Sequence, residues 1–509
     1  MIRARYFSKF TNNLIGLING GVSAVIVPKS LGPAGYGDFN FLRDSFEGMV
    51  NTIDLNSSNA HFVYTSRLSD SRRVNLFQFY ITMLVGVLLI TLVTALYVTG
   101  KTGLFWPGQE TAYIYAGAVF CYLSYLATNL TNLSDSKGLT VVTERYRRVF
   151  SLAAMAVLIA LFLVSWLDLR AYFIYVMAMQ ALMTVTFAFI LRRSGAFDFR
   201  LRKMTLDELK EVSGHFYRYS APLVVVLFVG FAINYFDRWF LQLIGGSVTQ
   251  GYYSLSLRLA TVSILFTSAM TPIFMQTVAK AHAQGESAKI SAIFRKIGVF
   301  YFTAAFISIF FSFHSREVVE LIGGAAYSGA VVPMTVMMLY PIHQTYGRFC
   351  GAVLLSTERT DLYRNITVFT SLAGVPLSFI LLAPESYFGL DLGATGLALK
   401  TVAVQALSVN LMLFAACRIT GQPFMAFFSR QAAVIALLAL LGFASSAAGA
   451  ALFGAPGKAG SALRLLSSGS VYLPLALLLC LAFPGLLGVS REELNEYFTA
   501  FLRYIGKRG

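Results

Sequence analysis

The chain has 509 residues, of which 57% are hydrophobic and 13% are charged. A soluble protein carries about 25% charged residues, so this composition excludes an ordinary soluble domain. The formal net charge is +16 at pH 7. Because the basic residues are scattered between hydrophobic segments, the charge argues against nucleic acid as a partner and favours membrane topology and an anionic substrate.

Apolar windows of about 20 residues, the length of a bilayer-spanning helix, predict about fourteen transmembrane segments. The first follows Arg3, Arg5 and Lys9 and is interpreted as an uncleaved span. Six segments precede a polar break and eight follow it. They lie near residues 9–30, 36–62, 75–99, 110–133, 147–168, 170–191, 217–243, 251–278, 294–313, 331–356, 362–383, 391–417, 427–453 and 464–487.

The break, residues 192–218, is rich in charged side chains and predicts an amphipathic linker between two halves. With fourteen spans, both termini lie on one side of the membrane. Placing them in the cytoplasm puts most of the 40 Lys and Arg residues in cytoplasmic segments, as the positive-inside rule requires. The outward exceptions are Lys29, Lys101, Arg170, Arg316, Lys458 and Arg464, and those within spans are Arg43, Arg238, Arg258, Arg348 and Lys400.

The two halves share a pattern after their first spans. It reads LGPAGYGDFNFLR at residues 31–43 and IGGSVTQGYYSLSLR at residues 244–258. Each is an outward glycine turn, then Gly-Tyr, then an arginine, so Arg43 and Arg258 are expected at comparable places. A similar glycine-rich turn at residues 322–327 leaves chance resemblance as an alternative.

Polar residues recur along the first two spans at helical spacing. In the second span, one face holds Tyr36, Arg43, Glu47, Asp54 and His61. In the first span, a narrower stripe holds Asn12, Gly16, Asn19 and Ser23. Two adjacent helices with polar stripes predict a wet cavity between them, lined among others by Asn12, Asn19 and Tyr36.

A charge at the bilayer centre costs about 2.5–3.5 kcal/mol on insertion scales, so intramembrane charges must pair or face water. Arg43 fits either a cavity position or an i,i+4 ion pair with Glu47, and the two are compatible. Arg258 has no acid one helical turn away. It is interpreted as an anion-binding residue or as the partner of an acid on another helix, such as Asp54 or Glu47.

Two further basic residues are candidates for the same cavity. Arg348 shares a helix face with Gln344, and Lys400 shares one with Gly393 and Gly396. Each fits substrate contact, while snorkelling of Lys400 or an interhelical pair of Arg348 is the alternative.

Other ionisable groups fit supporting roles. Asp237 and Arg238 are adjacent and point to different helix faces, which favours a structural or gating ion pair with another helix. His61 and Asp54 are candidates for proton coupling. The four cysteines lie in apolar runs without metal-ligand spacing, and the chain shows no nucleotide-binding loop. We therefore expect neither a metal nor another cofactor, apart from H⁺ or Na⁺ as a coupling ion.

At the Gly-Pro-Ala-Gly-Tyr-Gly turn, and again at Asp237-Arg238 followed by Gly245-Gly246 and Gly251-Tyr252, the chain resembles a known family. It is similar to the polysaccharide transporters of the multidrug/oligosaccharidyl-lipid/polysaccharide (MOP) flippase superfamily, the group with Wzx-type O-antigen flippases. The resemblance implies an all-α polytopic membrane protein with two pseudo-symmetric six-helix lobes in a V shape. The expected divisions are 1–205 for the N-terminal lobe, 206–420 for the C-terminal lobe, and 421–509 for an extra helix pair and tail.

The resemblance also implies a function. A cationic cavity would open alternately to the two sides of the bacterial inner membrane and move a polyprenyl-diphosphate-linked oligosaccharide outward. In related flippases, arginines in the first two helices of each lobe bind the diphosphate, and Arg43 and Arg258 are the corresponding candidates here. This chain departs from the pattern because it lacks basic residues within the first helix itself. The implied partners are membrane lipids and the polymerase and chain-length regulator of the glycan pathway.

Three other functions compete with this one. A membrane polymerase or ligase would carry a large external loop, whereas the predicted outward loops are short. A cation-coupled drug exporter of the same fold would line its cavity mainly with acids, for which Glu47 and Asp54 are candidates. A flippase for another polyprenyl-linked precursor, of peptidoglycan or teichoic type, shares the same physical requirements.

Overall fold

The computed structural model describes residues 2–67, 71–195, 204–453, 457–493 and 495–496. These residues form eighteen α-helices and three short 3₁₀ helices, without a β-strand among them. The chain divides into two compact units, residues 1–251 and 252–509. The protein is an all-α polytopic membrane protein, as the composition predicts.

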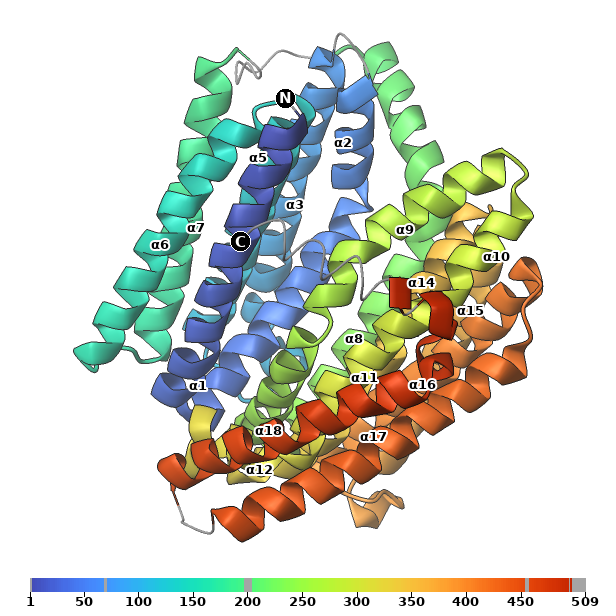
Figure 1. Cartoon of the computed structure of the whole chain (residues 1–509). Coiled ribbons are helices and arrows are strands. Elements are labelled where there is room, and N and C mark those ends of the chain that lie inside the picture. Colours follow the sequence, from blue (N-terminus) through green and yellow to red (C-terminus); the bar gives the residue numbers. More distant parts are fainter. Residues whose placement is uncertain (1, 68–70, 196–203, 454–456, 494, 497–509) are drawn as a thin grey trace. The chain divides into compact units, whose positions relative to one another are not determined.

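The first unit contains seven complete helices and most of an eighth (Figure 1). They are α1 (Ile2–Asp54), α2 (Ser57–Arg67), α3 (Arg72–Val98), α4 (Thr102–Phe105), α5 (Thr111–Ser136), α6 (Thr140–Leu163), α7 (Leu169–Arg193) and α8 (Leu206–Val262). The unit ends at Gly251 and so takes in residues beyond the expected lobe boundary at 205. Part of the predicted linker, residues 196–203, lies outside the described residues, as does the predicted tail from 497 onwards.

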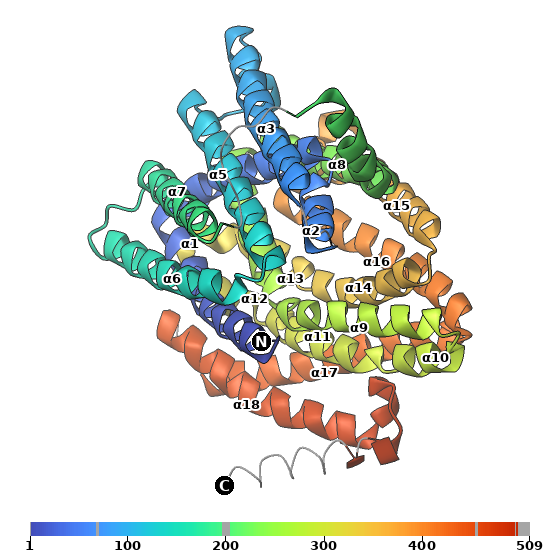
Figure 2. The same cartoon turned by 90° about the horizontal axis from the view of Figure 1, so that it is seen from above.

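The second unit contains the end of α8 and the remaining helices. They are α9 (Leu265–Ala283), α10 (Ser287–Arg295), α11 (Ile297–Phe313), α12 (Ser315–Ile322), η1 (Ala325–Ala330), α13 (Val331–Met337), α14 (Tyr340–Ser356), α15 (Thr360–Leu382), η2 (Glu385–Tyr387), α16 (Gly393–Thr420), α17 (Phe424–Leu452), α18 (Lys458–Ala482) and η3 (Pro484–Leu487). Figure 2 shows α17 and α18 side by side. Tyr472 of α18 stacks on Phe306 of α11 with ring centroids 5.0 Å apart, so the last helix pair packs onto this unit.

Ten helices in the described residues are long and apolar enough to cross a membrane, or eleven if the bent pair formed by η1–α13 and α14 is one span. Two of the ten, Ile15–Asp54 and Val224–Val262, are 40 and 39 residues long. A bilayer needs only about 20 residues per helical span, so each has the length of two predicted segments. Each predicted segment therefore has a helical counterpart, although α5 does not pass the same test of length and hydropathy.

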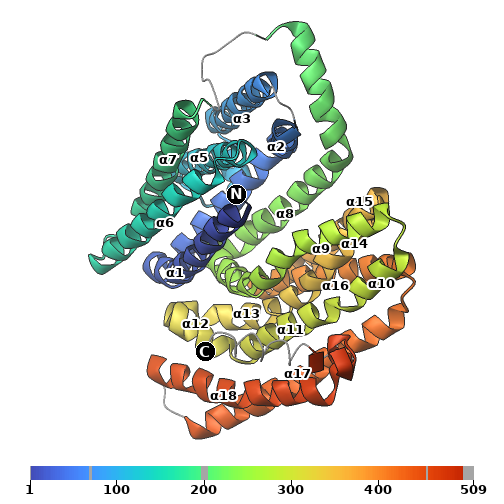
Figure 3. The ribbon, with the colours of Figure 1, turned by 45° about the horizontal axis from the view of Figure 1, so that its top comes forward.

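Both long helices break at a glycine. Gly32 in α1 has φ 66° and ψ 176°, and Gly246 in α8 has φ 65° and ψ −172°. Only glycine adopts such angles without strain, and Pro33 suits the first position of the helix that follows. Figure 3 shows that α1 folds back on itself at this break. The two predicted spans of α1 are therefore one helical hairpin.

The matching breaks place the two repeats in register without a gap. Gly37 and Gly251 follow their breaks at the same spacing, and a Cβ atom at either position would collide with the other segment. A Cβ on Gly37 would meet the carbonyl oxygen of Ser247, and one on Gly251 would meet that of Pro33. Ser247 and Pro33 are each the first residue after a break, so the contact is reciprocal.

This register corrects the expected equivalence of the two arginines. Counted from the two breaks, Arg258 corresponds to Asp44, and Arg43 corresponds to Leu257. A shift of one residue turns a side chain by about 100° around its helix, so the arginines do not occupy equivalent faces of the repeats.

A second correction concerns the polar stripe of the second span. α1 ends at Asp54, and Leu55 and Asn56 take φ values of 51° and 63°, so α2 starts as a separate helix. Tyr36, Arg43, Glu47 and Asp54 lie on α1, but His61 lies on α2. The predicted continuous stripe therefore does not extend to His61.

Candidate functional site

The Arg43 and Glu47 side chains form the i,i+4 ion pair considered as one alternative from the sequence. Arg43 Nε lies 3.4 Å from a carboxylate oxygen of Glu47. The exposed fractions of the two side chains are 35% and 55%, so the pair is partly accessible. An accessible pair of this kind contributes little to stability, about 0.3–0.5 kcal/mol. It leaves Arg43 chemically available to an anion.

Arg238 forms a much more enclosed ion pair. Its guanidinium donates to the Asp44 carboxylate of α1 and, at 2.9 Å, to the side-chain oxygen of Gln250. The Gln250 amide in turn donates to the Arg238 carbonyl at 2.6 Å. Arg238 is 8% exposed. An interhelical ion pair was expected for this residue, and the structure identifies Asp44 as its partner. The adjacent Asp237 is also buried.

A second polar group joins the same two helices. Asp38 of α1 accepts hydrogen bonds from Ser247, just after the α8 break, and from Gln109 at 2.5 Å. Gln242 donates to Ser247 at 3.0 Å and to the Pro107 carbonyl at 3.3 Å. These contacts attach both sides of the α8 break to α1 and to the segment before α5.

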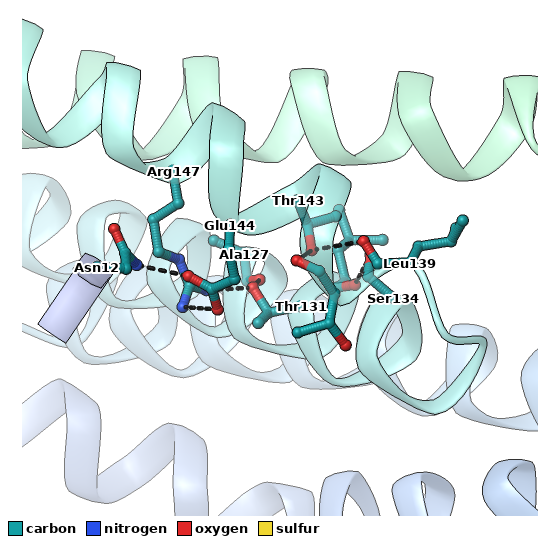
Figure 4. Close-up of polar contacts among 10 residues, drawn as sticks. Asn12, Ala127, Thr131, Ser134, Leu139, Thr143, Glu144 and Arg147 are labelled. Carbon is teal, nitrogen blue, oxygen red and sulfur yellow. Dashed lines mark hydrogen bonds and ion pairs between the residues drawn. The ribbon is translucent and has the colours of Figure 1, made fainter. Parts of the chain in front are cut away.

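Asn12 and Asn19, the expected cavity-lining amides of the first span, form hydrogen bonds with α6. Asn12 donates to Glu144 of α6 at 2.6 Å, and Asn19 donates to Ser151 of the same helix at 3.2 Å. Figure 4 shows Glu144 between Asn12 and Arg147. Arg147 also donates to Thr131 of α5 at 2.8 Å. These contacts join α1 to α6, and a cavity-lining role of the two amides stays a prediction.

The remaining candidates of the first unit are buried. Tyr36 is 6% exposed, and its carbonyl accepts from Asn40 at 2.7 Å. Asp54 accepts hydrogen bonds from Ser57 and Tyr125, and so joins α1, α2 and α5. His61 Nε2 lies 2.9 Å from Asn75 Oδ1 of α3.

In the second unit, Arg258 and Arg348 differ from the arginines above. The Arg258 side chain is exposed and forms no ion pair or hydrogen bond with the described residues. Arg348 is partly buried, and its Nε atom has no hydrogen-bond partner within the described part of the chain. One turn earlier, Gln344 accepts a hydrogen bond from Gln405 of α16. α14 thus presents an arginine beside a polar interhelical contact.

Lys400 of α16 is 5% exposed and lies against α15. A Cβ atom on Gly374 would lie 2.8 Å from Lys400 Cε, so the ammonium stem occupies space that only a glycine leaves. Lys400 is therefore a buried cation inside the second unit.

The structure shows where each candidate lies but does not unite them all. Arg43 belongs to the first unit, and Arg258, Arg348 and Lys400 belong to the second. A cavity that contains all four stays a prediction. In the described ranges, no group of three or more His, Cys, Asp or Glu side chains has the arrangement of a metal site.

Several polar residues were missed from the sequence, above all Asp38, Asp44 and Glu144. Asp44 is adjacent to Arg43 but lies on a different helix face, so the polar stripe of the second span does not include it. A weak signal existed, because a buried Arg238 needs an acid on a neighbouring helix. Glu144 was assigned to a cytoplasmic segment, whereas α6 begins before it at Thr140.

Solved structures of MOP-superfamily transporters have a similar fold. No family model and no curated protein sequence matches the chain. Among solved structures, the lipid II flippase MurJ in an inward closed conformation is similar, with a TM-score of 0.64 and 14% identity over 94% of this chain and 98% of that one.

Two further structures support the same fold. An inward-facing multidrug resistance MATE family transporter matches with a TM-score of 0.61 and 13% identity, over 81% of this chain and 95% of its own. The third is a MOP-superfamily transporter from Pyrococcus furiosus, described as having a binding pocket of reverse polarity. It matches with a TM-score of 0.55 and 12% identity, over 82% of this chain and 95% of its own.

Proposed function

We propose that this protein is a flippase that moves a polyprenyl-diphosphate-linked oligosaccharide from the cytoplasmic to the periplasmic leaflet of a bacterial inner membrane. The observation that carries the proposal is Arg258, an exposed arginine on a predicted membrane span without an ion-pair partner in the described chain. An intramembrane arginine without a counter-charge is costly unless it meets water or an anionic ligand.

A diphosphate group suits this arginine. It carries about two negative charges, and a guanidinium offers planar paired donors that match phosphate oxygens. Arg43, which pairs with Glu47 at a partly accessible position, provides a second cation of the same type. Rocking of one lobe against the other would carry the bound headgroup across the membrane, while the polyprenyl chain stays in lipid.

The length of the structural matches favours a lipid flippase over a drug exporter. The lipid II flippase matches 94% of this chain, whereas the MATE transporter matches 81% although 95% of its own length is covered. A drug exporter remains the second candidate because the MATE transporter matches this chain with a TM-score of 0.61. A flippase for a peptidoglycan or teichoic precursor is compatible with the same observations.

Within this proposal, the cargo is a glycan repeat unit for O-antigen or exopolysaccharide synthesis. The polymerase and chain-length regulator of that pathway would receive it on the outer side. The net charge of +16 fits an anionic lipid-linked cargo better than a cationic drug.

Deletion of the gene tests the function directly. The lipid-linked glycans of the deletion strain would be analysed by mass spectrometry, with an external glycosidase added to intact spheroplasts. We expect complete repeat units that accumulate and stay protected from the glycosidase. Truncated units would indicate an assembly enzyme, exposed complete units a polymerase or ligase, and an unchanged lipid pool a drug exporter. Each of these three results would contradict the proposal.

Arg258 variants test the anion site. Loss of charge-assisted hydrogen bonds costs about 1.5–3 kcal/mol, so Arg258→Ala should lower transport by about 10- to 100-fold without loss of folding. Arg258→Lys should keep only part of the transport activity, because an ammonium group lacks the paired donors of a guanidinium. Arg316→Ala is the matched control, since Arg316 is exposed in an outward segment of the same unit. Normal transport by Arg258→Ala would disprove the site.

A further inference from the structure

The seam between α14 and α16 in the second unit carries a strip of polar side chains. The two helices pack side by side (Figure 2). The Gln405 amide nitrogen of α16 donates to the side-chain oxygen of Gln344 on α14. Further along both helices, a Cβ atom on Gly347 would lie 2.8 Å from a Val409 methyl group. Because the paired residues advance in the same direction on both helices, α14 and α16 run parallel.

The polar strip continues by one helical turn on either side of these two glutamines. One turn earlier lie Tyr340 on α14 and Thr401 on α16. The Thr401 hydroxyl lies 3.1 Å from the hydroxyl of Tyr253, near the end of α8. One turn after Gln344 lies Arg348, which is close enough to Tyr340 for an electrostatic interaction. We name this set the α14–α16 strip, and its members are Tyr340, Gln344, Arg348, Thr401 and Gln405.

Arg348 is the charged member of the α14–α16 strip, and it has no ion pair with the described residues. Its Nε atom is buried without a hydrogen-bond partner in that part of the chain. All five side chains of the strip are partly exposed, so a ligand can reach them. A cation within a candidate membrane span is costly unless it meets water or an anion. The strip therefore suits an anionic ligand.

The neutral members of the strip indicate what kind of anion it suits. The Gln344–Gln405 hydrogen bond uses one acceptor and one donor, so the Gln344 nitrogen and the Gln405 oxygen can still bind sugar hydroxyls. A guanidinium binds a carboxylate through two parallel hydrogen bonds. A diphosphate would need a further cation, and the strip contains none, since the neighbouring Lys400 lies against α15.

We propose that the α14–α16 strip binds an acidic sugar, such as a uronic acid, in the glycan of the transported lipid. Arg348 holds the carboxylate, and the two glutamines hold hydroxyl groups of the same or the adjoining sugar. This inference rests on the proposed function, because a glycan-bearing cargo is what brings such a sugar into a membrane protein. It adds that the glycan is acidic and is recognised apart from the diphosphate assigned to Arg258.

Thermal unfolding of the purified full-length protein in detergent tests the proposal without reference to transport. The acidic probe is a soluble tetrasaccharide of alternating glucuronic acid and N-acetylglucosamine. The neutral probe is its carboxyl-reduced form, in which glucose replaces each glucuronic acid. At constant ionic strength, we expect the acidic probe to raise Tm by about 1–3 °C and the neutral probe by less than half as much. An equal rise with both probes, or no rise with either, would overturn the proposal.

Arg348 variants identify the residue that distinguishes the two probes. Arg348→Gln removes the charge, so it should abolish the difference between the acidic and the neutral probe. Arg359→Gln is the matched control, because Arg359 is an exposed arginine that precedes α15 in the same unit, and it should leave the difference intact. A full difference in Arg348→Gln would show that the carboxylate binds elsewhere and would overturn the proposal.

A double variant keeps the test decisive if Arg348→Gln does not fold. Gln344→Leu combined with Gln405→Leu replaces both partners of one hydrogen bond by apolar groups, a change that is nearly neutral for stability. The double variant should lose most of the response to both probes, because it removes the groups that bind sugar hydroxyls. An unchanged response would overturn the strip as proposed.

Sodium pyrophosphate, as a third probe, separates this inference from the proposed function. Pyrophosphate should raise Tm through Arg258, so Arg258→Ala should lose the pyrophosphate response and keep the response to the acidic tetrasaccharide. A pyrophosphate response without a response to the acidic tetrasaccharide would overturn the strip and leave the proposed function standing. The opposite result would contradict the diphosphate site and support the strip.

Discussion

Three of the arginines on the predicted spans have different environments. Arg43 pairs with Glu47 on its own helix and stays accessible. Arg238 is enclosed between Asp44 and Gln250. Arg258 is exposed without an ion pair in the described chain. The cost of an unpaired charge rises with burial, so the three residues should respond differently to the same substitution.

Arg238→Ala should lower the stability of the protein strongly. Breaking a buried ion pair by removing one partner costs about 3 kcal/mol or more, because the remaining charge is left unpaired. Because the Asp44 side chain is 33% exposed, we expect the loss of stability to lie near the lower end of this range, at about 3 kcal/mol. Thermal unfolding of the detergent-solubilised protein would measure the loss.

A double-mutant cycle identifies the source of that loss. Asp44→Ala in the Arg238→Ala background should cost less than Asp44→Ala alone, since the pair is already broken. Arg43→Ala is the matched comparison, and its effect should be within about 0.5 kcal/mol because the Arg43–Glu47 pair is accessible. Strictly additive effects of the Arg238 and Asp44 changes would show that the two residues do not interact.

The sequence predicted residue types better than residue partners. An interhelical ion pair was expected for Arg238 because a buried charge must be neutralised, but helical periodicity alone cannot say which helix lies opposite. Asp44 and Glu144 were missed for that reason. Asn12 and Asn19 lie on one helix face as predicted, yet their hydrogen bonds are made with α6, a contact that depends on tertiary packing.

At the scale of elements, the glycine breaks determine how the long helices turn and meet. Gly32 and Gly246 supply backbone angles that a side chain would strain. Gly37 and Gly251 then allow two helix backbones to approach closely. The two pairs of glycines thus have separate tasks, one conformational and one steric.

Gly37→Ala and Gly251→Ala should each lower Tm. A Cβ on Gly251 would lie 2.8 Å from the Pro33 carbonyl carbon, and one on Gly37 would lie 2.7 Å from the Gly251 nitrogen. Backbone atoms cannot move aside as a flexible side chain would, so the helices must separate. Thermal unfolding measures the effect.

Gly230→Ala in α8 provides the control. No atom lies within 4 Å of a Cβ built there, and its φ is not positive. Alanine is favoured over glycine in a helix by about 0.5–1 kcal/mol, so this variant should raise Tm. If Gly37→Ala and Gly251→Ala raised Tm as Gly230→Ala does, the close approach of the two helices would not contribute to stability.

The sequence located helical segments well and their breaks poorly. Each apolar window coincides with helical residues in the structure, because length and hydropathy are local properties. They did not reveal that α1 stops at Asp54, since neither length nor hydropathy marks the positive φ values of Leu55 and Asn56. The sequence also aligned the two repeats incorrectly, because it matched their Gly-Tyr pairs. The correct register follows from the backbone angles of Gly32 and Gly246, which the sequence does not show.

For the whole molecule, the distribution of charge predicts the orientation in the membrane. Cytoplasmic termini place most Lys and Arg residues inside. The orientation depends on the number of spans. One span more or less before the linker would move every later loop to the opposite side of the membrane. The breaks within α1 and α8 are therefore essential to the predicted topology.

Cysteine labelling in intact cells tests this orientation. In a background with Cys480→Ala, Lys101→Cys should react with a membrane-impermeant maleimide, and Lys289→Cys should react only after lysis. Both positions are exposed, and the other cysteines, Cys121, Cys350 and Cys417, are buried. Labelling of Lys289→Cys from outside would reverse the predicted orientation of the second half.

The reciprocal contact at Gly37 and Gly251 also bears on the origin of the chain. Each glycine meets the carbonyl of the residue that follows the other break, which is the pattern that a two-fold axis produces when identical subunits meet. A gene for a self-associating protein of about half this length would leave this geometry after duplication and fusion.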